Sequence, residues 1–300
     1  MTITDPTRRH FLGGLAALAV LPIGGGTDFS SPLSGAFEEA ERLRGGRIGV
    51  SALDLQTGRT VAHRADERFA MCSTFKWILG GLILQEAERH AGLLSRDITI
   101  AEADLVSHSP VTRARLGATM RVAQLCEAAI CESDNTAANL LLQMIDGPKG
   151  FTSRLAAIGD ATTRLDRTET ALNSAIAGDE RDTTTPRAMT RLLKSFLFED
   201  LLSETSRPIL RDWMLSTRNG KNRLKAGIGS GWKVGHKPGT NNTNINNDVG
   251  FLLSAAKRRH PIIISSFSDA PGALDESADR SHAHVAAAIL TDFEAVSTIS

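Results

Sequence analysis

Residues 47–53, RIGVSAL, decide the fold together with the turn Gln56-Thr57-Gly58 and the returning run 60–63. The alternation of apolar and polar residues and the glycine-containing turn predict a β-hairpin. The other strand-like segments lie near the far end of the chain, at 232–234, 249–254 and 261–266. Strands from the two ends have to pair to complete one sheet, so the sequence predicts a sheet built from both termini.

The long stretch between these strands is helical in pattern, because apolar residues recur there every three or four positions. The helical segments expected along the whole chain are 34–44, 75–90, 121–131, 136–143, 149–157, 186–197 and 276–297. We therefore predict the α/β class, with an antiparallel sheet flanked by helices (31–68 and 217–300) plus an all-helical domain (69–216). Active sites favour such domain junctions, so we expect the site there.

The composition excludes several classes of protein. The 300 residues are 41% hydrophobic and 23% charged, which is enough apolar material for a core and unlike a disordered chain. The 34 basic and 34 acidic residues balance, so no basic surplus indicates a nucleic-acid partner. Three cysteines in a chain of this length do not make a disulfide scaffold. A monomer is the default expectation.

The first 30 residues have the order of an export signal. Arg8 and Arg9 precede a mild apolar run at 11–23, and residues 24–34 are rich in glycine, serine and proline. The apolar run is shorter than the roughly 18 residues that a membrane span needs. This order predicts a twin-arginine signal, a periplasmic enzyme and no stable membrane association after the signal is removed. The alternative is an amphipathic N-terminus.

The motif Ser73-Thr74-Phe75-Lys76 opens a predicted helix. Because residues three apart share a helix face, we expect the Lys76 ammonium to reach the Ser73 hydroxyl. A serine becomes a good nucleophile only when a base takes its proton. The same S-x-x-K pattern occurs at Ser230 and Ser254, but these lie in or near predicted strands, where positions i and i+3 point to opposite faces.

Two further polar motifs follow predicted helix and strand ends. Ser133-Asp134-Asn135 offers a serine that can relay a proton and an asparagine that can bind an amide through a donor and an acceptor. In Lys237-Pro238-Gly239-Thr240, the lysine can bind a carboxylate and the glycine lets a ligand approach the backbone. Each motif alone also fits an ordinary turn or strand end.

A polar stretch with weak periodicity runs from Arg164 to Asn173 and continues at 178–184. Arg167 and Asp182 are placed to close the neck of this loop as an ion pair. Glu169 and Asn173 can then hold one water between a carboxylate and an amide, as general-base hydrolysis requires. The alternative is a solvated surface loop, although long loops in compact domains are usually functional or disordered.

These motifs occur together and in one order: S-x-x-K at Ser73, S-D-N at Ser133, E-x-x-x-N at Glu169 and a lysine-glycine motif at Lys237. In this order the sequence resembles the class A serine β-lactamases. The resemblance covers about residues 35–300. It implies hydrolysis of the β-lactam ring of antibiotics, with no metal or organic cofactor.

The resemblance implies two sets of residues. The expected catalytic residues are Ser73, Lys76, Ser133 and Glu169, and the expected substrate-binding residues are Asn135, Asn173, Lys237, Gly239, Thr240, His108 and Arg223. In the family's reaction the first serine attacks the lactam carbonyl, its lysine or the glutamate takes the proton, and the second serine passes a proton to the leaving nitrogen. The backbone N–H groups of Ser73 and Thr240 stabilise the oxyanion. The glutamate, with Asn173, activates the water that clears the acyl-enzyme.

The third motif departs from the family's pattern. Pro238 stands where members have threonine or serine, so a hydroxyl that binds the substrate carboxylate is missing. Thr240, on the same side of the strand, and Arg223, where some members carry a carboxylate-binding arginine, are expected to compensate in part. His108 stands in the place of an aromatic at the cleft mouth, and His236 replaces an aspartate. We expect altered carboxylate recognition with the chemistry kept.

Other functions compete with this interpretation. A penicillin-binding DD-peptidase acylates on the same kind of serine but lacks the deacylating loop, so Glu169 and Asn173 argue against it. A β-lactam sensor acylates without turnover and needs a membrane helix, which is not evident after residue 23. Metal-dependent hydrolysis is disfavoured, because His282 and His284 do not share a helix face.

Overall fold

A five-stranded antiparallel sheet forms the centre of the computed structural model, which describes residues 32–241, 243–256, 259–270 and 276–297. In the sheet order β2-β1-β9-β8-β7, the strands are β1 (Arg47–Asp54), β2 (Thr60–His63), β7 (Trp232–Thr240), β8 (Ile245–Ser254) and β9 (Ile262–Asp269). The predicted sheet built from both ends of the chain is confirmed, since β1 pairs with β9 and places Ser51 opposite Ser265. The expected export signal at residues 1–30 lies outside the described residues.

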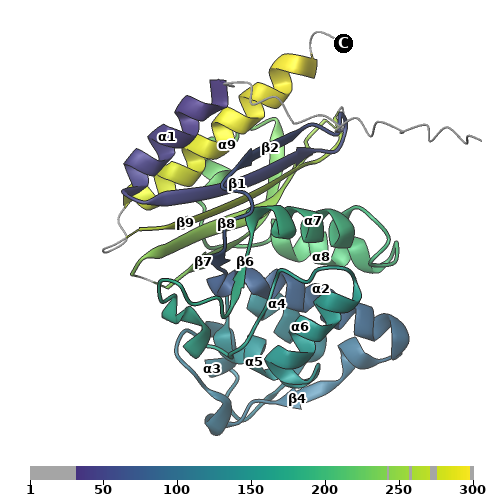
Figure 1. Ribbon diagram of the computed structural model, residues 1–300. Helices are drawn as coiled ribbons and strands as arrows, with labels where there is room; N and C mark the ends of the chain where they lie inside the picture. Colours follow the sequence, from purple (N-terminus) through teal and green to yellow (C-terminus); the bar gives the residue numbers. More distant parts are fainter. Residues whose placement is uncertain (1–31, 242, 257–258, 271–275, 298–300) are drawn as a thin grey trace, which may run out of the picture. The chain divides into compact units, whose positions relative to one another are not determined.

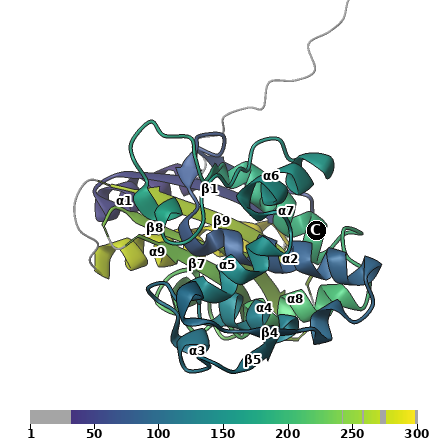
Figure 2. The same ribbon diagram turned by 90° about the horizontal axis from the view of Figure 1, so that it is seen from below.

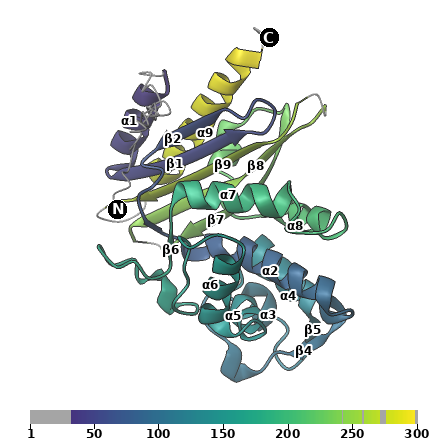
Figure 3. The same cartoon turned by 45° about the vertical axis from the view of Figure 1, so that its right-hand side comes forward.

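Two helices cover one face of the sheet. These are α1 (Pro32–Arg44) and α9 (Glu276–Ser297), which lie side by side over the strands (Figure 1 and Figure 3). Successive strand residues point to opposite faces, so alternate side chains are available to each layer. The residues that form the buried cluster under these two helices include Ile48, Val50, Ile264, Ile289 and Phe293.

The opposite face of the sheet packs against the remaining helices. Figure 1 shows α7 (Pro186–Leu197) and α8 (Ser206–Leu215) next to the strands, with the other helices beyond them. Those other helices, seen from below in Figure 2, are α2 (Phe75–Arg89), α3 (Pro110–Arg113), α4 (Val122–Cys131), α5 (Asn135–Gln143) and α6 (Gly147–Ala157). A larger apolar cluster joins this layer to the sheet through Phe251 and Phe267. The predicted antiparallel sheet with helices on both faces is therefore confirmed.

Helix α2 runs through the middle of the helical layer. All ten residues from Phe75 to Leu84 are buried, as expected for a helix that is apolar on every side. Two glycines allow its neighbours to come close. A Cβ on Gly80 would lie 2.6 Å from Ile130 Cδ1, and one on Gly81 would lie 2.8 Å from Phe196 Cδ1. The helix that begins just after Ser73 is thus fixed by tight packing.

The structure differs from the sequence prediction at several elements, among them β8, which begins at Ile245 rather than at 249. Strand β7 continues past Val234, through Pro238, to Thr240, which is possible because β7 is an edge strand, where proline is tolerated. Helix α8 was not delimited, because Pro208 and several charged residues obscure its apolar pattern. Two small ladders were also not anticipated, because strands of two or three residues carry no periodic signal: β3 (Phe69–Ala70) with β6 (Thr183–Thr184), and β4 (Asp97–Thr99) with β5 (Thr119–Arg121).

Candidate active site

A cavity of about 460 Å³ lies between residues of the helical layer and strand β7. The expected site residues that line it are Ser73, His108, Ser133, Asn135, Asn173, Arg223, Gly239 and Thr240. Three further expected residues, Lys76, Glu169 and Lys237, are buried and contact this lining through the hydrogen bonds described below. The structure therefore brings the expected residues together at the junction of the sheet and the helices.

Ser73 lies in a single turn of 3-10 helix, Cys72–Thr74, that leads directly into α2. The preceding Cys72 has a φ of 45°, a left-handed conformation that costs about 1–3 kcal/mol for a residue with a side chain. Burial raises the pKa of the Cys72 thiol, so this thiol stays uncharged at neutral pH. Ser73 lines the cavity, whereas its neighbour Cys72 is fully buried.

The Lys76 ammonium is fully buried among oxygen atoms. Its Nζ lies 2.8 Å from Glu169 Oε1, 2.9 Å from the Ser133 carbonyl oxygen and 2.5 Å from Asn135 Oδ1. An ammonium has three N–H groups, which these three acceptors can occupy. The Ser73 hydroxyl donates to the same Glu169 Oε1 at 3.5 Å. In place of the expected direct contact, Ser73 and Lys76 thus meet at one carboxylate oxygen.

The S-D-N motif at Ser133 forms the tight connection between α4 and α5. Ser133 has a φ of 59°. Asp134 caps α5, because its Oδ1 accepts a hydrogen bond from the N–H of Ala137 at 2.9 Å. Its Oδ2 accepts from the N–H groups of Val111 and Thr112, both at 2.9 Å, at the start of α3. Asp134 therefore fixes one wall of the cavity to another.

Asn135 joins this motif to the segment that carries His108. Its backbone N–H donates to the His108 carbonyl at 3.0 Å, and its side-chain amide donates to the Ser107 carbonyl at 2.9 Å. His108 itself is exposed and has a φ of 55°. The imidazole thus lies on the solvent side of the cavity, where it can form a surface for a ligand.

Glu169 is held through its backbone and its carboxylate. Its N–H donates to Asn139 Oδ1 and its carbonyl accepts from Asn139 Nδ2, both at 2.9 Å. The second carboxylate oxygen accepts from Asn173 Nδ2 at 2.6 Å. Within the described residues, the buried Oδ1 of Asn173 has no hydrogen-bond partner. Sequence reasoning missed Asn139, although its position four residues after Asn135 puts both on one face of α5.

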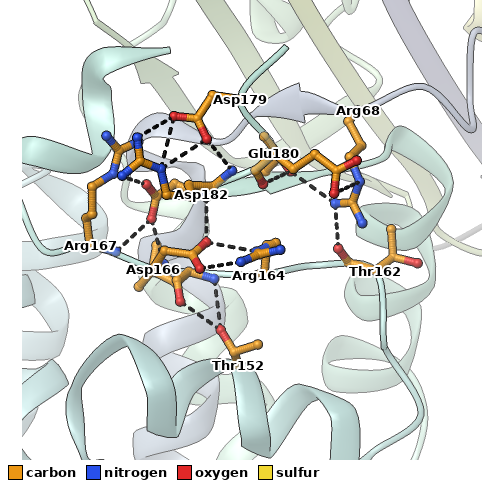
Figure 4. A network of polar contacts seen from close by, with 12 residues as sticks. Arg68, Thr152, Thr162, Arg164, Asp166, Arg167, Asp179, Glu180 and Asp182 are labelled. Carbon is orange, nitrogen blue, oxygen red and sulfur yellow. Dashed lines mark hydrogen bonds and ion pairs between the residues drawn. The ribbon is translucent and has the colours of Figure 1, made fainter. Parts of the chain in front are cut away.

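A buried carboxylate closes the neck of the loop that carries Glu169 (Figure 4). The predicted ion pair is confirmed, with Arg167 Nε donating to Asp182 Oδ2 at 2.6 Å. Asp182 Oδ1 accepts from the N–H groups of Asp166 and Arg167, at 2.7 Å and 2.9 Å. In return the N–H of Asp182 donates to Asp166 Oδ2 at 3.1 Å, and Arg164 pairs with Asp166 at 2.6 Å. The two ends of the loop are therefore tied by reciprocal bonds.

Lys237 extends from β7 toward the S-D-N motif and is fully buried. Its ammonium donates to Ser133 Oγ at 3.1 Å and to the Pro238 carbonyl at 3.0 Å. Burial, reinforced by the nearby Lys76 ammonium, holds the pKa of Lys237 well below its usual value. The glycine of the motif is needed for close packing, because a Cβ on Gly239 would lie 2.7 Å from the Met71 carbonyl oxygen.

Pro238, Thr240 and Arg223 line the side of the cavity next to β7. The Thr240 hydroxyl donates to the Ile245 carbonyl at 3.0 Å, so its proton is directed into the sheet. Arg223 donates through Nε to Asp279 at 2.7 Å, and through Nη1 to the carbonyls of Gly239 (3.3 Å) and Asn247 (2.8 Å). Thr240 and Arg223 were the two residues expected to compensate for the hydroxyl missing at Pro238. Of these two, Arg223 is the one that brings a positive charge to this side of the cavity.

Comparison with known proteins agrees with this geometry. A model of the Beta-lactamase enzyme family matches residues 32–293. Beta-lactamase L2 of Stenotrophomonas maltophilia is 43% identical over 263 residues, which cover 83% of this chain and 87% of that protein. A solved structure of an ancestral (GNCA) class A β-lactamase gives a TM-score of 0.83 at 44% identity, covering 86% of this chain and 99% of that chain. The chain belongs to the class A β-lactamase family.

This class A β-lactamase is a serine β-lactamase, a hydrolase that acts on a cyclic amide. Beta-lactamase AST-1 of Nocardia asteroides is similar to it at 45% identity over 232 residues, 77% of this chain and 74% of that protein.

The described residues contain no group of three or more His, Cys, Asp or Glu that could hold a metal ion. All three cysteines of the β-lactamase are buried and free. Among the described helices, none has both the length and the apolar character needed to cross a membrane.

The carboxylate at the loop neck should contribute measurably to the stability of this β-lactamase. In Asp182→Asn the free energy of unfolding should fall by about 3 kcal/mol, because Arg167 loses a buried charged partner and two N–H groups keep only a neutral acceptor. We expect the thermal midpoint to fall by about 5–10 °C, measured by circular dichroism. Asp200→Asn is the matched control, because the Asp200 side chain is fully exposed. Equal midpoints for the two variants would contradict this prediction.

Proposed function

We propose that this β-lactamase opens the β-lactam ring through an acyl-enzyme on Ser73, which a water activated by Glu169 then hydrolyses. The observation that carries the proposal is the shared carboxylate oxygen: Glu169 Oε1 lies 3.5 Å from Ser73 Oγ and 2.8 Å from Lys76 Nζ. A nucleophile, a base and a stabilising cation thus form one contact group at the wall of a cavity. Catalytic hydrogen bonds are often long without substrate and shorten in the substrate complex.

In the first step, Ser73 Oγ forms a bond to the lactam carbonyl carbon while its proton passes to Glu169. Lys76 does not take this proton in the geometry described, because its three N–H groups are directed at three oxygens. Its positive charge stabilises the carboxylate beside it. The backbone N–H groups of Ser73 and Thr240 stabilise the oxyanion, an interaction in which each donor contributes about 3 kcal/mol to lowering the barrier.

In the second step, the C–N bond of the ring breaks and the nitrogen takes a proton. Ser133 supplies it, since its hydroxyl lies 3.1 Å from Lys237 Nζ and 3.5 Å from Lys76 Nζ. The proton that Glu169 received in the first step passes through Lys76, whose Nζ contacts both Glu169 Oε1 and Ser133 Oγ, and restores the Ser133 hydroxyl, so Glu169 is a carboxylate again before the third step. Ser133 therefore acts as the acid and Lys76 as its proton relay, while the Lys237 ammonium stabilises the Ser133 oxygen as its proton leaves.

In the third step, water cleaves the ester between Ser73 and the opened ring. Glu169 takes the proton of the attacking water and passes it to Ser73 Oγ as the ester bond breaks, and Asn173 orients that water. The partnerless Oδ1 of Asn173 supports this role, because it is an acceptor for a water hydrogen beside the carboxylate that Asn173 Nδ2 already binds. The same pair of residues separates this proposal from a DD-peptidase, which has no such water site.

Substrate binding uses the remaining residues around the cavity. The Asn135 amide binds the acylamide side chain of the substrate, and His108 forms a surface for its distal group. Lys237 and Arg223 attract the carboxylate that most β-lactam antibiotics carry. Because Pro238 has no hydroxyl, this recognition depends on the two cations more than it would with threonine at 238.

Mass spectrometry of the protein mixed with benzylpenicillin tests the proposal. We expect steady turnover, together with a short-lived adduct at early times that maps to the peptide containing Ser73. The peptide containing Ser230, the exposed serine of one of the two further S-x-x-K sequences, is the internal control and should stay unmodified. A stable adduct without turnover would instead identify a β-lactam-binding sensor or a DD-peptidase. The absence of any adduct or turnover would refute the acyl-enzyme.

A further inference from the structure

A histidine and an aspartate form a buried pair behind the substrate-binding edge of the sheet. His236 Nδ1 lies 3.0 Å and 2.9 Å from the two carboxylate oxygens of Asp248. The exposed fractions of the two side chains are only 1% and 0%. His236 is on β7, and Asp248 on β8 lies directly opposite Pro238. A pair that is removed from water in this way has to be satisfied within the protein.

The pair does not touch the reacting groups. Successive residues of a strand point to opposite faces, so the His236 side chain leaves β7 on the face opposite to Lys237. Lys237 is the residue that contacts Ser133. Within the described residues, His236 Nε2 has no hydrogen-bond partner, so no described proton chain runs from it to Ser133. A role in this reaction therefore has to act through another residue.

That residue is Arg223, because the pair supports the turn that carries it. Asp248 Oδ2 also accepts a hydrogen bond from the N–H of Leu224, the next residue, at 3.2 Å. On the other side of the turn, a Cβ on Gly220 would lie 3.5 Å from His236 Cε1 and 2.8 Å from Pro238 Cβ. The segment 220–224 thus rests on His236 and is bonded to the partner of His236. Its distance from β7 depends on both side chains.

The position of this turn sets the position of a charge in the cavity. The Arg223 side chain is 10% exposed, lines the cavity and is held at its far end by Asp279 and by two strand carbonyls. The Arg223 side chain is fixed at one end by its backbone and at the other by the hydrogen bonds of its guanidinium. If the backbone of the turn moves, the guanidinium cannot readjust to the substrate. Charge-assisted hydrogen bonds are strongly directional, so a small shift of the turn changes the binding of a carboxylate.

We propose that His236 and Asp248 are positioning residues that hold Arg223 in place, and so determine specificity for the carboxylate of the β-lactam substrate. This inference rests on the proposed function, because it assigns Arg223 to the substrate carboxylate. It also gives a consequence of Pro238. With no hydroxyl at 238, the arginine has a larger share of carboxylate binding, and the support of its turn has a larger effect on affinity.

The test compares two substrates in three variants. His236→Leu removes the donor to Asp248, while His236→Asn keeps an N–H donor at about the place of Nδ1. His63→Leu is the matched control, because His63 lies on β2 at the opposite edge of the sheet. The substrates are benzylpenicillin and its methyl ester, which has no carboxylate charge. Kinetics are measured together with thermal unfolding.

We expect His236→Leu to raise KM for benzylpenicillin about tenfold, with kcat within about twofold and the ester unaffected, as the loss of one charge-assisted hydrogen bond predicts. His236→Asn and His63→Leu should stay within about twofold of the wild type for both substrates. An equal loss for the acid and the ester would refute the proposal. If His236→Leu does not fold, Asp248→Asn provides the same comparison, with a smaller rise in KM for the acid alone.

A double-mutant cycle identifies the residue through which the pair acts. Arg223→Ala alone should raise KM for the acid, and adding His236→Leu to it should change KM no further, because residues that act through one contact are not additive. Additive effects would refute the assignment to Arg223. Failure of the proposed function is seen separately: a wild type that forms no Ser73 adduct refutes the acyl-enzyme, whereas a normal adduct with no acid-specific effect refutes only the positioning role.

Discussion

The variant Glu169→Gln should react with benzylpenicillin once and then stop, with the opened ring still attached to Ser73. The amide has the shape of the carboxylate and can still accept a hydrogen bond from Asn173, so the water site keeps its geometry. It cannot take a proton from water, and the ester bond therefore remains. We expect kcat to fall by about 10³- to 10⁴-fold, near the upper end of what a general base contributes.

Attachment should survive in this variant because Lys76 changes its state. With glutamine at 169, the buried Lys76 loses the only carboxylate among its three acceptors. Burial beside a neutral amide favours the uncharged amine, which can accept the Ser73 proton. Rapid-quench mass spectrometry should show an adduct that forms within seconds and persists for minutes or longer.

Glu180→Gln is the matched control for this experiment. Glu180 belongs to the same loop, and its side chain is 65% exposed. This variant should turn over benzylpenicillin at the wild-type rate without accumulating an adduct. Wild-type turnover in Glu169→Gln as well would show that another group activates the water.

The variant Lys76→Met should fail one step earlier, with no adduct on Ser73. Methionine fills a similar space without a charge, so the fully buried Glu169 side chain loses its cation. In that environment the carboxyl is favoured in its protonated form, which cannot accept the serine proton. We expect the rate of acylation to fall by about 10³-fold. The contrast with Glu169→Gln separates the two halves of the reaction.

Stopped-flow absorbance with a chromogenic cephalosporin measures this acylation step, and intact-protein mass spectrometry checks for the adduct. Lys149→Met is the control, because Lys149 is exposed on α6 and remote in sequence from every motif. A burst of acylation in Lys76→Met as fast as in the control would show that the lysine charge is not needed for attack by Ser73.

The elements that the sequence predicted well are those with long periodic patterns. Helix α9 has the expected bounds, and α2 differs from its expected range by one residue at the end. Strand β7 was predicted to end six residues early, because Pro238 and Gly239 read as a turn in a single sequence. Only the strand order shows that β7 is an edge, where a proline interrupts nothing essential. Local patterns do not carry that information.

The site shows the same division between local and distant information. The motifs predicted which residues gather around the cavity, because three of them lie at the ends of predicted elements and the fourth lies in a long polar loop. They did not predict that Lys76 binds Glu169 and Asn135 in place of the Ser73 hydroxyl, which depends on how α5 and the loop pack against α2. The contact between His236 and Asp248 could not be predicted either, because it depends on the register in which β7 pairs with β8.

The pairing of β1 with β9 has a consequence for the order of folding. Arg47 and Asp269, which face each other across these strands and bond through their side chains, are 222 positions apart in the chain. Contacts of such high sequence separation close a large loop and form slowly. Strand β9 is the central strand of the sheet, between β1 and β8, and it is the last strand to be synthesised. The two halves of the sheet therefore cannot join before β9 is present. A nascent chain can therefore build helical turns early, but it gains its cleft only after nearly all of its residues have left the ribosome.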